Sequence, residues 1–202
     1  MADKSRFSAL WARSVGAAAE PVFYALDRGY ADRTRAYHNW DHIGAMLTGL
    51  DAARGEAEFA AADFDAIELA IWFHDAIYDP LAKDNEAKSV DLFKEAAGGG
   101  KSQVADMILA TTDHAPSADL STRLLLDLDL RILGASAQDY ARYAEAVRSE
   151  YAAVPEDAWR AARPAVLKRF LARPALYQTR YFHDRLEDRA RANMSREIDA
   201  LA

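Results

Sequence analysis

The chain has 202 residues, of which 51% are hydrophobic and 28% charged, and its formal net charge is -7. This composition is typical of a globular protein with a substantial core, and it excludes disordered and fibrous chains. The acidic balance disfavours binding to nucleic acid polymers, because their phosphate backbones carry the same sign of charge. Cysteine is absent, which excludes disulfides, thiolate nucleophiles and cysteine-held metal sites.

Membrane and secretion signals are missing from the sequence. No stretch approaches the roughly 20 consecutive apolar residues that a membrane-spanning helix needs. The first 20 residues are charged and amphipathic and contain no apolar run of the signal-peptide type. We therefore expect a cytoplasmic protein with no membrane partner. The sequence does not indicate an oligomeric state.

The patterns along the chain predict helices almost throughout. Gly and Pro are sparse, and apolar residues recur at helical spacing within residues 7–15, 64–78 and 140–151. Start and stop signals predict an N-cap at Asp84, for a helix that runs to the glycines at 98–100, and a capping box at Ser136 and Asp139. Pro155 is expected to open a helix, and Pro164 to break or kink one. The residues from about 178 to 201 are expected to form one long charged helix.

No strand pair, hairpin signal or domain linker is found in the sequence. The expected fold is therefore all-α, with about eight to ten helices in a single domain spanning residues 1–202. Within it we expect a metal core at about 35–135 and C-terminal helices over 136–202.

Two histidines lie four residues apart in the segment Tyr37-His38-Asn39-Trp40-Asp41-His42. On a helix this spacing places both imidazoles on one face, where they could share a site, although one could precede the helix start. Taken alone, the pattern is more typical of a pair of surface histidines, which are common.

The dipeptide His74-Asp75 lies in a strongly apolar stretch, and the helical pattern buries His74. A buried carboxylate is costly unless it is paired, hydrogen-bonded or bound to a metal. The alternative is a His–Asp pair satisfied by the backbone and a cation.

Asp127 and Asp129 interrupt the leucine-rich run from 124 to 133. Residues two apart on a helix point about 200° away from each other, so both cannot face one site in a regular helix. One of the two should be a ligand and the other structural, unless both face solvent.

Together, two histidines and two aspartates from three segments make a mixed nitrogen and oxygen ligand set. Such ligands favour one divalent metal ion, with Mn²⁺, Fe²⁺, Co²⁺ or Ni²⁺ ahead of Mg²⁺ and Zn²⁺. Open coordination positions on the metal would activate a water and polarise a phosphoryl oxygen.

The ordered set H…HD…D resembles the HD-domain superfamily of metal-dependent phosphohydrolases, which are all-helical bundles. The segments at 37–43, 72–79, 84–86, 127–134 and 189–194 look like a bacterial subgroup of predicted HD phosphohydrolases whose substrates are mostly unassigned. The resemblance covers roughly residues 5 to 200. Each motif is short, and the ordered combination carries the resemblance.

The resemblance implies roles for individual residues. His42, His74 and Asp75 carry over as metal ligands, and Asp129 carries over in preference to Asp127. The first motif also resembles the opening motif of cyclic-nucleotide phosphodiesterases, which makes His38 the general acid. The further ligands of their two-metal sites have no match here, so we expect one ion.

Other side chains are weaker candidates. His114 lies in an I-x-x-T-x-x-H element found in several HD proteins, which implies a contact to substrate phosphate, a proton relay or a second metal. Glu86 could orient the nucleophilic water, by analogy with acidic residues that follow the HD dipeptide. Lys83 and Arg131 could neutralise phosphate. A helix-end histidine, a first-turn glutamate and solvated cations are the simpler interpretations.

We therefore expect a metal-dependent phosphohydrolase that cleaves a phosphoester or phosphoanhydride of a small molecule such as a nucleotide. One alternative is an HD-fold di-iron oxygenase, which needs additional histidine ligands. The other is a non-catalytic helical module that senses a metal or a nucleotide.

Overall fold

The structure, a computed structural model, describes residues 3–202. Within that range all regular structure is helical, as expected from the sequence, and no strand is present. The ten α-helices are α1 (Lys4–Ser14), α2 (Ala19–Tyr30), α3 (Trp40–Ala53), α4 (Phe64–Phe73), α5 (Asn85–Ala96), α6 (Ser102–Ala110), α7 (Leu120–Leu130), α8 (Ala137–Glu150), α9 (Glu156–Leu171) and α10 (Arg180–Leu201). Two 3-10 helices, η1 (Ala57–Phe59) and η2 (Arg131–Gly134), complete the set.

Side-chain caps fix the start of several helices. Ser136 accepts a hydrogen bond from the main-chain N–H of Asp139 at the start of α8, which confirms the predicted cap. Asp84 and Pro155 occupy the N-cap positions of α5 and α9, also as predicted, although Asp84 makes no side-chain cap bond. Of the break or kink predicted at Pro164, the break is wrong: α9 continues through this residue, and packing against α10 holds the helix across the lost hydrogen bond.

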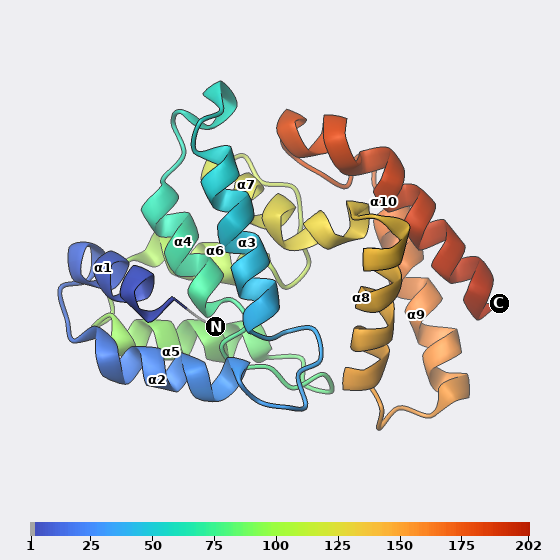
Figure 1. Cartoon of the computed structure of the whole chain (residues 1–202), viewed down its shortest axis with the longest axis horizontal. Helices are drawn as coiled ribbons and strands as arrows, with labels where there is room; N and C mark the ends of the chain where they lie inside the picture. The colour runs from blue at the N-terminus through green and yellow to red at the C-terminus, as the bar shows by residue number, and fades with distance from the viewer. Residues whose placement is uncertain (1–2) are drawn as a thin grey trace.

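Helix α4 lies at the centre of the N-terminal part of the molecule. Every residue from Ala66 to Phe73 is buried, because α4 packs against α1, α3, α6 and α7 on different sides. Figure 1 shows these helices gathered in the half of the molecule that carries the N-terminus. A helix covered on all sides needs no polar face, which explains the nearly continuous apolar run in its sequence.

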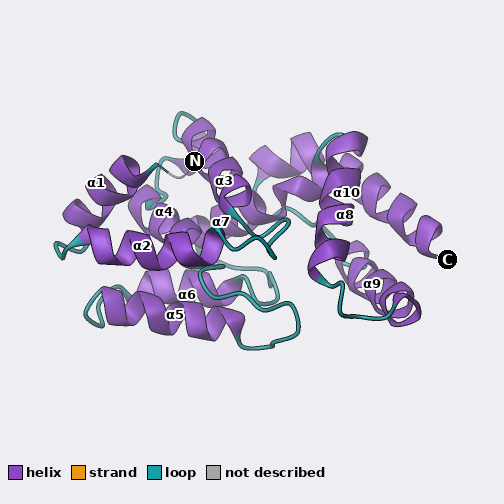
Figure 2. Cartoon of the chain, turned by 60° about the horizontal axis from the view of Figure 1, so that its bottom comes forward, coloured by secondary structure: helices purple, strands orange, loops and turns teal. Residues whose placement is uncertain are grey.

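Helices α8, α9 and α10 form the other half of the molecule, beside α3 and α7 (Figure 1). The short helix η2 connects α7 to α8 and packs against α10. Figure 2 shows loops gathered between the N-terminal helices and the α8–α9 pair. These loops place side chains at the junction of the two halves, where binding residues are commonly found.

The helical pattern expected over residues 64–78 is corrected by the structure. Helix α4 ends at Phe73, with His74 as its C-cap, and the chain then turns away before Tyr78. The guanidinium of Arg35 donates to the carbonyl oxygens of Asp75 and Ala76, at 2.7 and 3.1 Å. These tertiary hydrogen bonds outweigh the local preference for helix.

Among the helices described over residues 3–202, none combines the length and the hydrophobicity required to cross a bilayer.

Candidate metal centre

His42 lies in the first turn of α3, and His38 lies just outside it. Asn39 is the N-cap, and its side chain accepts a hydrogen bond from the N–H of Asp41. This cap makes the helix begin at Trp40. His42 therefore sits on a rigid helical turn and is only 5% exposed, whereas His38 is carried by the preceding loop.

His74 and Asp75 follow α4 directly, where the helix gives way to a loop. The imidazole Nδ1 of His74 donates to the carbonyl oxygen of Ile71 at 3.0 Å. This bond fixes the tautomer, so that Nε2 of a neutral His74 presents a lone pair. His74 is buried, and the adjacent Asp75 side chain keeps 14% of its surface exposed.

The side chains of the two aspartates of α7 point in different directions, as the geometry of a helix requires. Asp129 points toward His42, with Oδ1 at 3.2 Å from the Nε2 of that histidine. Asp127 is buried elsewhere and accepts hydrogen bonds from the main chain of Gln178 and Thr179 and from the Thr179 hydroxyl. Asp127 therefore anchors the start of α10, and Asp129 is the aspartate available for a ligand.

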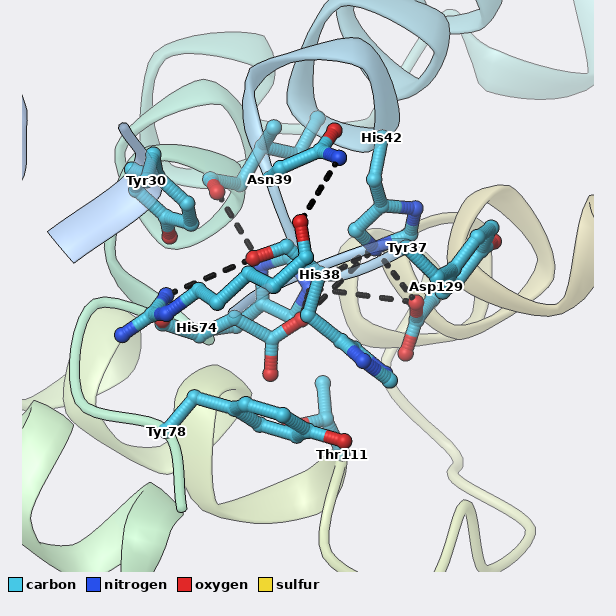
Figure 3. Close-up of polar contacts among 12 residues, drawn as sticks. Tyr30, Tyr37, His38, Asn39, His42, His74, Tyr78, Thr111 and Asp129 are labelled. Carbon is cyan, nitrogen blue, oxygen red and sulfur yellow. Dashed lines mark hydrogen bonds and ion pairs between the residues drawn. The ribbon is translucent and has the colours of Figure 1, made fainter. Parts of the chain in front are cut away.

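Three potential ligand side chains, those of His42, His74 and Asp129, converge at this point (Figure 3). His42, His74 and Asp129 each place one ligand atom within 4.8 Å of the other two, a group that could hold a metal ion. The two Nε2 atoms of His42 and His74 are 3.2 Å apart. Asp75 lies beside this group, with Oδ2 at 3.0 Å from Nε2 of His74 and 3.7 Å from Nε2 of His42.

The chemistry of these atoms suits a cation among them. Carboxylate oxygens are acceptors only, and the Nε2 of a neutral His74 is an acceptor as well. Lone pairs that face one another at such distances are stable when a proton or a metal ion lies between them. A histidine that donates its other ring N–H to a backbone carbonyl is also the usual arrangement of a metal ligand.

The electrostatics of the cluster favour positive charge. Burial lowers the pKa of His74, but the carboxylates of Asp75 and Asp129 outweigh burial and raise this pKa to about 9. Burial raises the pKa values of both carboxyl groups, and the surrounding histidines reverse the effect and hold the two pKa values below their usual range.

His38 is held beside the cluster by a buried carboxylate. Its Nδ1 donates to Oε2 of Glu150 at 2.6 Å, and the Glu150 side chain is only 1% exposed. The other oxygen of Glu150 accepts the main-chain N–H groups of Tyr37 and His38. Burial lowers the pKa of His38, and the bond to Glu150 reverses this and raises the pKa above its ordinary value.

Tyr78 covers the His38 imidazole. The two rings stack with their centroids 4.1 Å apart, and the Tyr78 hydroxyl donates to Glu150 at 3.0 Å. Figure 3 shows Tyr78 alongside this part of the cluster. The loop that follows His74 thus fixes the orientation of His38 from a second side.

His114 is brought to the same place by the loop after α6. It adopts a positive φ of 52°, which is unusual for a residue with a side chain. Its Nε2 donates to Oδ2 of Asp129 at 2.8 Å. The structure therefore places His114 as a support of the Asp129 carboxylate as well as a neighbour of the solvent-filled space beside the cluster.

The structure does not bring Glu86, Lys83 or Arg131 into this group. Within residues 3–202, no hydrogen bond or ion pair joins any of the three to the clustered side chains. Glu86 lies in the first turn of α5, where the helix dipole favours an acid, and Lys83 is exposed on the preceding loop. The Arg131 guanidinium instead donates to the carbonyl oxygen of Ala45, and it lines a cavity of about 810 Å³ whose wall also includes His42.

Two supporting residues are not found by the sequence reasoning. Glu150 lies in an ordinary charged helix, and nothing in its local pattern separates it from its neighbours. Arg35, which is buried and bound to the carbonyls of Asp75 and Ala76, lies near the first motif. The one signal available for Arg35 is its position, three residues before His38.

Comparisons of the chain with protein-family models, with curated proteins and with solved structures found no match.

Proposed function

We propose that the protein is a metal-dependent phosphohydrolase acting on a small phosphorylated molecule, with His42, His74, Asp75 and Asp129 as the ligands of one divalent ion. The observation that carries the proposal is the convergence of two Nε2 atoms and two carboxylate oxygens beside an imidazole that a buried glutamate holds. The resemblance to HD phosphohydrolases supports the same assignment. Mn²⁺, Fe²⁺, Co²⁺ and Ni²⁺ suit this mixed donor set better than Mg²⁺ or Zn²⁺.

When bound, a divalent cation supplies Lewis acidity, polarising a phosphoryl oxygen and lowering the pKa of water. In the hydrolysis, a bond forms between a water oxygen and phosphorus, and the bond between phosphorus and the leaving oxygen breaks. The chain's own residues position the substrate and supply the proton that the leaving oxygen needs.

His38 is the proton donor in this scheme. Glu150 accepts a hydrogen bond from Nδ1 of His38 and favours the protonated imidazole. Because Nδ1 is engaged in this way, Nε2 is the nitrogen that faces the substrate. The proton passes from Nε2 to the leaving oxygen as the bond to phosphorus breaks. The proton released by the attacking water passes to solvent, and solvent returns one to His38 before the next turnover.

The di-iron alternative has less support. It requires more imidazoles near the cluster, and among the described residues only His114 is available beside Asp129. His183 is exposed on α10, where it pairs with Asp184 at 3.3 Å.

The test is phosphate release from a panel of phosphate esters and anhydrides with added Mn²⁺, in the wild type, His38→Ala and His183→Ala. We expect metal-dependent release by the wild type that a chelator abolishes, and a loss of about 100-fold or more in His38→Ala. His183→Ala, an exposed histidine remote from the cluster, should match the wild type. Metal binding without release from any substrate would instead indicate a sensing module, and oxygen consumption would indicate the oxygenase.

A further inference from the structure

A cavity of about 590 Å³ lies where the α8–α9 pair faces the loops that carry His38 and His114. Both of these histidines line it, so it opens beside the metal centre. Its volume is in the range of small-molecule sites. The remaining walls come from the C-terminal helices, and their chemistry indicates what kind of molecule fits.

The wall provided by α9 changes character along the helix. Trp159, Ala162, Val166 and the Glu197-paired Arg163 line its first part. Arg169, Phe170 and Arg173 line its end and the turn that follows. Trp159 and Arg169 are separated by about 15 Å along the helix axis. The cavity therefore has an apolar end and a cationic end.

The two arginines at the cationic end have no carboxylate partner within residues 3–202. Arg173 donates to the main-chain carbonyl of His114 at 2.7 Å and to that of Asp113, and its guanidinium lies 4.6 Å from the centre of the Phe170 ring. Arg169 is exposed and forms no hydrogen bond or ion pair in the described chain. Arg163 is different, because Glu197 neutralises it at 2.7 Å.

The charge at this end is not cancelled by the nearby acid. Asp113 also lines the cavity, and its carboxylate accepts the N–H of Ala115. Burial and the neighbouring charge of Arg169 both lower the pKa of Arg173, and Asp113 offsets them only in part. Two neighbouring guanidinium groups on one wall of a cavity repel each other and favour an anion such as phosphate beside them.

The opposite end lies on the side of the proposed proton donor. Tyr78 stacks on His38 and binds Glu150, the last residue of α8. Tyr151 follows directly, and its ring centre lies 5.4 Å from that of Trp159. His38 therefore lies near the aromatic and aliphatic end of the cavity, and His114 lies near the arginines.

Of the four tryptophans, Trp159 is the one that lines this cavity. Trp40 packs inside the N-terminal half, with its ring centre 5.9 Å from Phe23 and 4.7 Å from Tyr30. Trp159 lines the cavity together with Tyr151.

We propose, on the basis of the proposed function, that the substrate is a phosphate monoester of an alcohol with an aromatic or apolar body. Its phosphate lies toward Arg169 and Arg173, its ester oxygen faces His38, and its organic group lies against Tyr151, Trp159 and Val166. Inorganic phosphate chains and esters of small polar alcohols would leave the apolar end unfilled.

The test is isothermal titration calorimetry on the full chain, with phenyl phosphate, glycerol phosphate and inorganic phosphate as probes. Chelator is present, so that no turnover occurs. We expect phenyl phosphate to bind about tenfold or more tightly than the other two probes. Arg169→Glu should weaken its binding about tenfold or more, whereas Lys168→Glu should leave it unchanged. Lys168 is the adjacent exposed residue of α9 and lies outside the cavity lining, so the two variants change the net charge equally.

Ala162→Trp probes the apolar end separately. Ala162 is exposed at the cavity wall, so the larger side chain fills the cavity rather than the core. It should weaken binding of phenyl phosphate and leave that of inorganic phosphate unchanged. Equal affinities for the three probes, or equal losses in Arg169→Glu and Lys168→Glu, overturn the proposal.

Hydrolysis with added Mn²⁺ then separates this proposal from the proposed function. If phenyl phosphate binds as expected but is never hydrolysed, the result supports the proposed binding mode and contradicts the proposed hydrolase function. If glycerol phosphate is hydrolysed faster than phenyl phosphate, the result supports the proposed hydrolase function and contradicts the assigned substrate class.

Discussion

Two residues of the candidate metal centre each have a second contact that fixes their orientation. The Ile71 carbonyl holds His74, and His114 holds Asp129. Ligands oriented in this way bind metals more tightly than ligands that must first become ordered.

The pH dependence of the proposed hydrolysis tests the role of Glu150. A general acid acts in its protonated form, so kcat/KM should fall as pH rises through the raised pKa of His38. Glu150→Gln keeps the oxygen that accepts the main-chain N–H groups but removes the negative charge. We expect the alkaline fall to move to lower pH by about one unit or more, measured as a pH–rate profile.

Glu145→Gln is the matched control for this change. Glu145 is exposed on the same helix, α8, and its substitution removes the same charge. Its profile should coincide with that of the wild type. Identical profiles for all three proteins would show that Glu150 does not set the protonation of His38.

At the scale of helices, a close approach between α2 and the loop after α4 shapes the site. A side chain at Gly29 would place its Cβ 2.7 Å from the carbonyl oxygen of Ala76, near the guanidinium of Arg35. Arg35 in turn binds the carbonyl oxygen of Asp75. The absence of a side chain at Gly29 therefore lets α2 pack against the segment that positions a metal ligand.

Gly29→Ala should destabilise the protein by about 1–3 kcal/mol, because the added carbon forces the backbone apart. Urea denaturation measures the change, and metal affinity should fall with it. The control is Gly44→Ala in α3, where an added Cβ meets no atom within 4 Å. That variant should be more stable than the wild type by up to about 1 kcal/mol, because Ala favours helix over Gly. Destabilisation by Gly44→Ala, or none by Gly29→Ala, would contradict this interpretation.

Much of the helical architecture follows from local sequence signals. The caps at Ser136 and Pro155 mark helix starts correctly, and helical periodicity separates Asp127 from Asp129. The same periodicity extends α4 too far, to Tyr78. The helix ends early because Arg35, distant in sequence, binds the next carbonyl groups, and a local pattern contains no information about that contact.

At the scale of the whole molecule, the candidate metal centre depends on both halves of the chain. The candidate ligands come from α3, α7 and the end of α4. Helix α8 adds the Glu150 carboxylate that binds His38, and α8 and α9 form walls of the adjacent cavity. His38 and Glu150 are separated by 112 positions in the sequence. Short motifs therefore predict the candidate ligands, whereas the supporting carboxylate and the cavity emerge only from the packing of the two halves.

The most direct test of the metal centre is the metal content of the folded protein, measured by elemental analysis of the wild type, Asp129→Asn and Asp127→Asn. The two variants make the same substitution on one helix, and asparagine keeps an acceptor oxygen in each. We predict about one equivalent of divalent metal in the wild type and in Asp127→Asn, and a large loss in Asp129→Asn. Equal metal content in the two variants, or a wild type that binds no metal under any loading condition, would contradict the account.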